Sequence, residues 1–189
     1  MARPRKFDEV TVLRAVRDQF WSTGYAGTSV DDVLAATGLG KGSLYGAFGD
    51  KHQLFVRVFD GYCTEVVDQV RKSLEGPDST AFERLRAHVV AVAAGSDLRG
   101  CLLAKGTTEL AGQDADVTTR ARRAFEELED LLTRCVTQAQ RHGDIAPDAD
   151  PRALAGLLLA VLRGIEALGK AGKTSLHEIA ETALAVLPR

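Results

Sequence analysis

A short polar face lies between positions 41 and 48. Leu44 and Phe48 are four positions apart, which predicts a helix that buries these two side chains. The opposite side of this helix carries an ammonium group and two hydroxyl groups, from Lys41, Ser43 and Tyr45. Such groups donate hydrogen bonds to phosphate oxygens and to the edges of bases. The pattern therefore indicates DNA as a candidate partner.

A second short helix is predicted directly before this face. Valine and leucine side chains share one side of residues 30–37, and Thr28 and Ser29 are placed to cap that helix. Gly38 then supplies a chain reversal, because glycine adopts a left-handed backbone at little steric cost. Two helices joined by a tight turn have the geometry that lays the second helix in the major groove of DNA. The same pattern also occurs where helices simply pack together in an all-helical protein.

Residues from about 7 to 54 resemble the TetR family of bacterial transcriptional regulators. The matching residues are Gly24, Tyr25, Thr28, Ser29, Ala36, Thr37, Gly38, Leu39, Lys41, Gly42, Ser43, Leu44, Tyr45, Phe48, Asp50, Lys51, Leu54 and Phe55. Gly40 departs from the family pattern, which usually has a serine or similar cap there, and Leu34 stands where a small residue is common. Beyond this stretch the resemblance rests on length and helical pattern. It implies a three-helix DNA-binding domain in residues 1–52 and a domain for ligand sensing and dimerisation in residues 53–189.

The resemblance also implies which residues contact DNA. The groove-facing positions are Lys41, Gly42, Ser43 and Tyr45. Base reading falls mainly to Lys41, because Gly46 and Ala47 offer almost no side chain. The positions placed to bind phosphates are Thr28, Ser29 and Lys51. A basic arm that would enter a minor groove or clamp phosphates consists of Arg3, Arg5 and Lys6. A solvated terminus is the alternative for the arm.

The composition is that of an ordinary soluble globular protein. Of the 189 residues, 45% are apolar and 26% are charged, with a net charge of −2, so any DNA contact depends on a local basic surface. The three cysteines, Cys63, Cys101 and Cys135, are widely spaced, which argues against a disulfide framework. Neither a signal peptide nor an apolar run of membrane-spanning length is evident. We therefore expect a cytoplasmic protein without membrane contact.

Nearly every segment of the chain has the helical period, and none shows a convincing strand alternation. The predicted fold class is therefore all-α, with about nine helices: an N-terminal helix-turn-helix domain of three helices and a C-terminal helical bundle. Asp50 with Gln53 is expected to open a long helix that both domains share as a rigid strut. Ser175 with Glu178 forms a second candidate capping box at the last helix.

Small residues recur every four positions in the helix predicted for residues 151–168, at Gly156, Ala160 and Gly164. Glycine inside a helix costs about 1 kcal/mol relative to alanine, so this row needs a packing reason. The helix is apolar nearly all round and is therefore expected to be buried both inside its domain and at an interface. A central helix within a monomer is the alternative. The resemblance implies that the last two helices of each protomer build a dimeric four-helix bundle, which favours a homodimer.

Cys101 is a candidate reactive thiol. It begins a predicted helix after Gly100, where the helix dipole and the cations Arg99 and Lys105 favour the thiolate. Some family members with a Gly-Cys-Leu opening to this helix sense electrophiles or oxidants, so the resemblance implies that role here. A small buried hydrophobic side chain is the alternative for Cys101. Cys63 and Cys135 are expected in the core.

A pocket for a small-molecule inducer is expected between the middle helices. Its candidate lining residues are Phe59, Tyr62, His88, Cys101, Glu109 and Phe125. A polar residue of the core is the alternative for His88. The four histidines and three cysteines do not cluster in the sequence, so we expect neither a metal site nor a cofactor.

These patterns together predict a homodimeric repressor that binds a pseudo-palindromic operator of double-stranded DNA and is released by a small-molecule inducer. One alternative is a repressor that senses redox state or electrophiles through Cys101. A second is an all-helical enzyme, which the sequence disfavours because it has no nucleophile elbow, phosphate loop or metal motif. A third is an interaction protein with a vestigial DNA motif.

Overall fold

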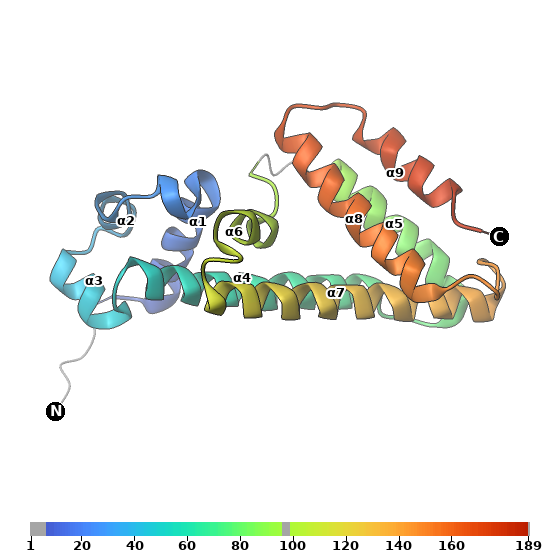
Figure 1. The fold of residues 1–189 in the computed structure, drawn as a ribbon, viewed down its shortest axis with the longest axis horizontal. Coiled ribbons are helices and arrows are strands. Elements are labelled where there is room, and N and C mark those ends of the chain that lie inside the picture. The colour runs from blue at the N-terminus through green and yellow to red at the C-terminus, as the bar shows by residue number, and fades with distance from the viewer. Residues whose placement is uncertain (1–6, 96–98, 189) are drawn as a thin grey trace. The chain divides into compact units, whose positions relative to one another are not determined.

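The computed structural model of the protein describes residues 7–95 and 99–188. These residues form nine α-helices and one short 3-10 helix, and they contain no β-strand (Figure 1). The all-α prediction is therefore confirmed. The helices are α1 (Glu9–Gly27), α2 (Val30–Thr37), α3 (Lys41–Phe48), α4 (Lys51–Leu74), η1 (Asp78–Thr80), α5 (Ala81–Ala94), α6 (Leu102–Leu110), α7 (Ala115–His142), α8 (Pro151–Lys170) and α9 (Leu176–Ala185).

The chain divides into two compact units, each of which combines two separate segments of the sequence. The first unit combines Met1–Cys63 with Leu102–Ala121, and the second combines Thr64–Cys101 with Arg122–Arg189. Helix α6 and the first turns of α7 therefore pack with the N-terminal helices, which the sequence analysis did not predict. The functional division into residues 1–52 and 53–189 stays a prediction.

Local polar caps set the helix starts of the first unit. The side chain of Asp8 accepts hydrogen bonds from the amides of Val10 and Thr11 at the start of α1. Ser29 and Asp32 form a reciprocal capping box at the start of α2. Asp50 and Gln53 form another at the start of α4, with N···O distances of 2.8 and 3.2 Å, as the sequence predicted. These caps satisfy amides that a helix leaves without partners.

The core of the first unit is a cluster of aromatic side chains on α1 and α4. Phe20, Phe55 and Phe59 are each 0–1% exposed. The ring of Phe55 meets that of Phe20 edge-on at 5.1 Å and lies 5.5 Å from that of Phe59. Edge-to-face pairs of this kind add to the stabilisation that comes from burial alone. The cluster therefore fixes the start of α4 against α1.

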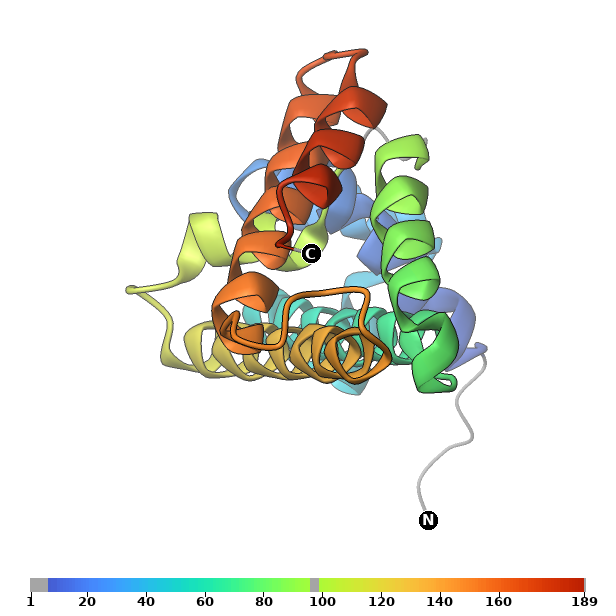
Figure 2. The same cartoon turned by 90° about the vertical axis from the view of Figure 1, so that its right-hand side faces the viewer.

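The second unit is built around helices α5, α8 and α9. Asp150 caps α8 and Pro151 occupies its first turn, which is the position where proline is tolerated. Helix α9 runs antiparallel to α8, as Figures 1 and 2 show from two sides. The predicted capping box at α9 is wrong, because Ser175 makes no side-chain cap hydrogen bond in the described structure. None of the helices in the described ranges combines the length and apolar composition needed to cross a membrane.

Candidate nucleic-acid interface

Helices α2 and α3 form the predicted helix-turn-helix. Gly38 ends α2 in the left-handed conformation, with φ 67° and ψ 11°, and its amide donates to the carbonyl of Leu34. Leu44 and Phe48 are buried beneath α3, at 1% and 6% exposure. The bounds of α3 and its buried side are as the sequence predicted. The first unit thus has a short helix held on one side by its core and open on the other.

The open side of α3 carries few side chains. Lys41, Gly42 and Ser43 are exposed, and Tyr45 is half-buried. A Cβ atom added at Gly42 or Gly46 would meet no atom of the described residues within 4 Å. The ammonium of Lys41 lies 5.8 Å from the centre of the Tyr45 ring. A flat partner could therefore approach the backbone of α3 closely, with Lys41 and Tyr45 as the long side chains that meet it.

Lys51 is held beside this surface by an aromatic ring. Its ammonium lies 4.3 Å from the centre of the Tyr25 ring, a distance at which a cation is attracted to the ring face. The Tyr25 ring in turn lies 5.0 Å from that of Phe55. Burial, with the nearby carboxylates of Asp50 and Asp114, raises the pKa of Tyr25, so its ring stays neutral. Lys51 therefore has a defined position at the start of α4.

Thr28 and Ser29 are placed differently from our prediction. Thr28 is fully buried, and its hydroxyl donates to the carbonyl of Gly24 at 2.6 Å, so its side chain is not available to a phosphate. The prediction of a phosphate contact by the Thr28 side chain is therefore wrong, because that hydroxyl is committed inside the fold. Ser29 is exposed but belongs to the capping box. Its hydroxyl donates to Asp32 at 2.7 Å, and this bond together with the Ser29 amide lowers the pKa of Asp32.

The predicted basic arm is not tested. Arg3, Arg5 and Lys6 lie outside the described residues, so the arm stays a prediction.

The expected pocket residues are divided between the two compact units: Phe59, Tyr62 and Glu109 belong to the first, and His88, Cys101 and Phe125 to the second. Phe59 is a core residue, and the carboxylate of Glu109 accepts a hydrogen bond from the amide of Tyr25 at 2.6 Å. The inducer pocket therefore remains a prediction.

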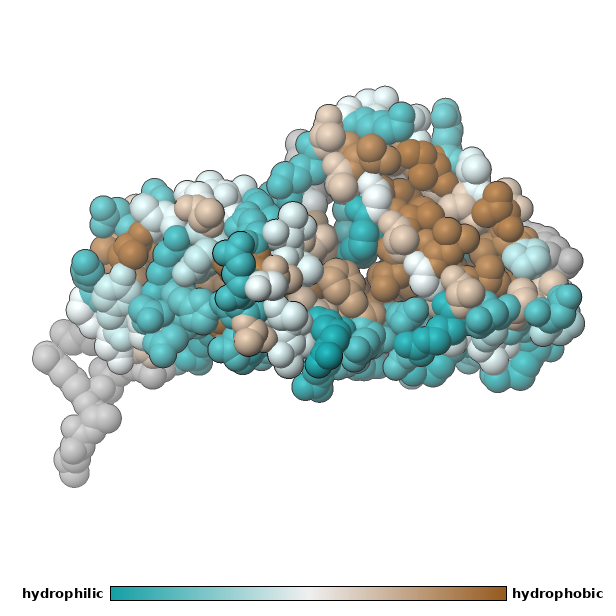
Figure 3. Space-filling model, viewed as in Figure 1, coloured by the Kyte–Doolittle hydropathy of each residue, from teal (hydrophilic) through white to brown (hydrophobic). Residues whose placement is uncertain are grey.

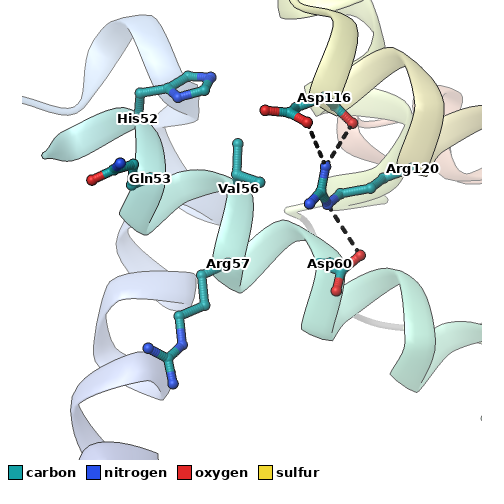
Figure 4. Close-up of a pocket in the computed structure, with 7 residues that line it drawn as sticks. All are labelled: His52, Gln53, Val56, Arg57, Asp60, Asp116 and Arg120. Carbon is teal, nitrogen blue, oxygen red and sulfur yellow. Dashed lines mark hydrogen bonds and ion pairs between the residues drawn. The ribbon is translucent and has the colours of Figure 1, made fainter. Parts of the chain in front are cut away.

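A cleft of about 330 Å³ opens in the first unit between the start of α4 and the start of α7 (Figure 4). Its lining residues are His52, Gln53, Val56, Arg57, Asp60, Asp116 and Arg120. Arg120 pairs with Asp60 and Asp116 at 3.2 Å each, and Arg57 pairs with Glu9. Because its arginines are already paired, we assign no ligand to this cleft.

Cys101 lies beside a cation that the sequence analysis missed. A guanidinium nitrogen of Arg163 donates to its Sγ atom at 2.9 Å and also approaches Glu166 at 2.9 Å. Lys105, one of the two cations predicted for this role, donates to the carbonyls of Trp21 and Ser22. Burial raises the pKa of Glu166, and the Arg163 guanidinium opposes that shift. No sequence signal pointed to Arg163, because it comes from a distant helix, and the contribution of Arg99 stays a prediction.

All three cysteines are buried, and the core prediction for Cys63 and Cys135 is confirmed. The Sγ atom of Cys135 donates to the carbonyl of Ala81 at 3.3 Å. Burial raises the pKa of the Cys135 thiol. Cys101 is 6% exposed, so its alternative as a packed side chain stays open.

The small-residue row of α8 points away from the interior of its unit. Leu158, Leu162 and Ile165 are buried on one side of α8, whereas Ala160 is exposed and Gly164 is half-buried on another. A Cβ atom at Gly164 would meet no atom of the described chain within 4 Å. Large apolar side chains are exposed on α8 and directly after α9, and Figure 3 shows an apolar surface over these helices: Leu157 is 47%, Leu168 39% and Val186 63% exposed. Gly164 therefore has no packing reason within the described protomer, whereas a Cβ atom added at Gly156 would lie 3.3 Å from the Glu129 Oε1 atom.

His88 is half-buried in the second unit. Its Nδ1 atom is 3.0 Å from the hydroxyl of Ser73. Burial, with a smaller contribution from the positive charge of Arg163, lowers the pKa of His88 to about 4. The ring is therefore neutral at pH 7, and His88 is a half-buried polar residue at the edge of the core.

These features define the first unit as a helix-turn-helix module of the class that reads DNA. Two family models match the chain: "Tetracyclin repressor-like, C-terminal domain" over residues 81–184, more than half of the chain, and "Bacterial regulatory proteins, tetR family" over residues 12–58. The protein belongs to the TetR family of bacterial regulatory proteins.

Similar proteins cover between 77% and 99% of the chain. The HTH-type transcriptional repressor ComR of Escherichia coli (strain K12) is 28% identical over 194 residues, covering 98% of this chain and 91% of ComR. DhaR of Mycobacterium sp. (strain GP1), another HTH-type transcriptional repressor, is 29% identical and covers 77% of this chain and 73% of its own. Among solved structures, a cysteine mutant of the TetR family regulator CifR, complexed with 26-base-pair double-strand operator DNA, matches with a TM-score of 0.82. Its identity is 28%, with 99% of this chain and 100% of the CifR chain covered.

The depressed pKa of His88 predicts a pH dependence of stability. The unfolded histidine titrates near 6.5 and the folded one near 4, so the unfolded state binds more protons between these values. The free energy of unfolding should therefore be highest above pH 6.5 and fall by at most about 3 kcal/mol on this account as the pH drops to 4. Denaturant unfolding from pH 7 to pH 4 should show a shallower decline for His88→Gln than for the wild type. His177→Gln, at an exposed histidine, is the control, and an unchanged decline in His88→Gln would contradict the prediction.

Proposed function

We propose that the protein is a homodimeric transcriptional repressor that binds a pseudo-palindromic operator and is released by a small-molecule inducer. The observation that carries the proposal is the open face of α3, with Lys41 and Tyr45 beside the positioned ammonium of Lys51. ComR and DhaR, which are repressors, and CifR, which was solved on operator DNA, support it. In a dimer, two copies of α3 would reach successive major grooves.

Each part of the interface has a distinct task. Lys41 donates to guanine O6 or N7 and supplies most of the base preference. Ala47 contacts a thymine methyl group, and the glycines of α3 let its backbone approach the bases. Tyr45 and Lys51 bind the phosphate backbone, together with the amide end of α2 that follows Ser29. Few side chains read bases, so phosphate contacts provide most of the affinity.

The outward row of α8 is the proposed dimer contact. Gly156, Ala160 and Gly164 would let a second copy of α8 approach closely, and the apolar side chains around them would be buried at the same time. A homodimer supplies the packing reason that Gly164 lacks within one described protomer. It also supplies the two-fold symmetry that a pseudo-palindromic operator requires.

The protein is a regulator and not an enzyme in this proposal, because both family models and the curated relatives describe regulators. Binding to DNA supports a cytoplasmic location for the protein. An inducer would act by binding one of two conformations more tightly, and it shifts their equilibrium only by that difference in affinity.

A redox- or electrophile-sensing repressor is the second candidate. The specific observation in its favour is the guanidinium of Arg163 at 2.9 Å from the Cys101 Sγ atom. A cation in contact with a sulfur atom promotes the reaction of a cysteine as a nucleophile. Covalent modification of Cys101 would then take the place of the bound inducer.

The DNA contacts can be tested on a fragment from the region upstream of the gene. Lys51→Ala should weaken binding similarly on all sequences and reduce the salt slope by about 1, because one phosphate contact is lost. Lys41→Ala should cost about 1–3 kcal/mol at one base position and relax the preference there. Fluorescence anisotropy at several salt concentrations measures both. Lys72→Ala, at an exposed lysine near the end of α4, is the control. DNA binding that is unchanged in both Lys41→Ala and Lys51→Ala would contradict the proposed DNA contacts.

The dimer contact can be tested by filling the small-residue row. Gly164→Leu should overpack the interface by about 1–3 kcal/mol and shift the protein toward monomer. Sedimentation velocity across micromolar concentrations gives the oligomeric state. The matched control is Gly61→Leu, since Gly61 is an exposed helical glycine whose added Cβ also meets no described atom within 4 Å. A Gly164→Leu protein that stays fully dimeric would place the interface elsewhere.

The second candidate predicts that Cys101 is the most reactive of the three thiols. Alkylation rates read for each cysteine by mass spectrometry should rank Cys101 first, and Arg163→Met should slow its reaction, because the cation that favours the thiolate is gone. Cys101→Ser should keep DNA binding but lose release by electrophiles. If Cys101 stays unlabelled while another cysteine reacts, it is a packed core residue and the non-covalent inducer is favoured.

A further inference from the structure

Two side chains of α6 bind the backbone of α1 at its only break within the described residues. The ammonium of Lys105 donates to the carbonyls of Trp21 and Ser22 at 2.9 and 3.0 Å. One turn later on α6, the carboxylate of Glu109 accepts hydrogen bonds from the amides of Tyr25 and Ala26, at 2.6 and 3.4 Å. We call Lys105 and Glu109 the α6 clamp.

The break explains why the clamp has this charge pattern. Gly24 has φ 81° and ψ 174°, which interrupts the helical hydrogen bonds of α1. The carbonyls before such a break carry partial negative charge, and the amides after it carry partial positive charge. The cation of the clamp meets the carbonyls and its anion meets the amides. The clamp therefore satisfies the polar groups that the break exposes.

The break and the clamp also require each other sterically. A Cβ atom at residue 24 would lie 2.0 Å from the Glu109 Oε1 atom, so glycine leaves room for the carboxylate in its observed position. On α6, Gly106 lies between the clamp residues, and a Cβ there would lie 2.5 Å from the ring of Phe59. Phe59 is fully buried on α4. Helix α6 is therefore anchored on α4 while it holds α1.

A short chain of contacts connects the clamp with the DNA-facing surface. Glu109 holds the amide of Tyr25, and the ring of Tyr25 holds the ammonium of Lys51 at 4.3 Å. The carbonyl of Gly24 accepts from Thr28, directly before the capping box of α2. The clamp thus acts on the residues that place both Lys51 and the start of the helix-turn-helix.

We propose that Lys105 and Glu109 are positioning residues for DNA binding. They act from α6, which lies far along the chain from the helix-turn-helix. They hold α1 in its broken form, and this fixes Tyr25 and, through its ring, the ammonium of Lys51. The inference rests on the proposed function as a DNA-binding regulator. It assigns α6 to the DNA-binding machinery without any contact between α6 and DNA.

Charge substitution at Glu109 separates positioning from simple electrostatics. Removing a carboxylate from a DNA-binding unit should strengthen DNA binding if only long-range charge matters. The clamp predicts the opposite: Glu109→Met, which has no acceptor, should weaken binding about tenfold, and Glu109→Gln, which keeps one acceptor oxygen, about threefold. Thr108→Val is the matched control on the same helix, since the Thr108 hydroxyl bonds only its own helix in the described structure. Equal or tighter binding by Glu109→Met overturns the proposal.

A double-mutant cycle tests the route through Lys51. If Glu109 acts by placing that ammonium, Glu109→Gln should lose most of its effect in the Lys51→Ala background. A merely structural role of Glu109 would give additive losses, and additivity overturns the route. Lys105→Met should weaken binding in the wild-type background and lose most of this effect in the Lys51→Ala background, because it too acts by placing that ammonium. A further fall of the salt slope by about 1 in the Lys51→Ala background would make Lys105 a phosphate ligand and would overturn its positioning role.

Hydrogen exchange distinguishes a failure of the α6 clamp from a failure of the proposed DNA-binding function. The amides of Tyr25 and Ala26 should exchange at least several-fold faster in Glu109→Gln than in the wild type, with no DNA present. If the wild type binds no upstream DNA while these amides respond as expected, the proposed function fails and the clamp stands. If the wild type binds DNA and these amides are indifferent to Glu109, the clamp fails and the function stands.

Discussion

A buried or partly buried backbone must find partners for its amides and carbonyls, and in this protein that requirement is sharpest at Gly24. The break in α1 lets the chain turn toward α2, but it also leaves polar groups on both sides of the turn without helical partners. Lys105 and Glu109 supply those partners from α6. The compact first unit includes α6 for this reason, although 74 residues lie between the end of α1 and the start of α6.

Features that depend on neighbouring residues were readable from the sequence. The bounds of α3, the left-handed Gly38 and the capping box of Asp50 with Gln53 all follow from side chains within a few positions of one another. Such patterns fix local hydrogen bonds and the buried side of a short helix, and little else is needed to recognise them. The absence of a side-chain cap at Ser175 shows their limit, because a suitable pair of residues permits a capping box without enforcing it.

Features that depend on the fold were not readable in the same way. The sequence suggested Glu109 as a pocket residue and Lys105 as a neighbour of Cys101. Both side chains instead form hydrogen bonds with the backbone of α1. Arg163, which contacts Cys101, comes from α8. Thr28 has the type of a phosphate ligand, but packing buries it completely. In each case the residue type was informative about chemistry, whereas the partner was decided by helices that meet only after folding.

The positioning contacts matter for DNA affinity because the open side of α3 carries few side chains. A recognition helix rich in long polar side chains can adjust its rotamers to the bases, but α3 offers Lys41 and Tyr45 between positions that carry almost no side chain. A flexible lysine on its own loses rotamer freedom when it binds a phosphate, which offsets part of the gain. The ring of Tyr25 restricts Lys51 before DNA arrives, so less freedom is lost on binding. The ring can do so only while its own backbone is held, and that backbone is held by α6. In the proposed interface, a change that moves α6 would therefore alter affinity for DNA without altering a DNA-contacting residue.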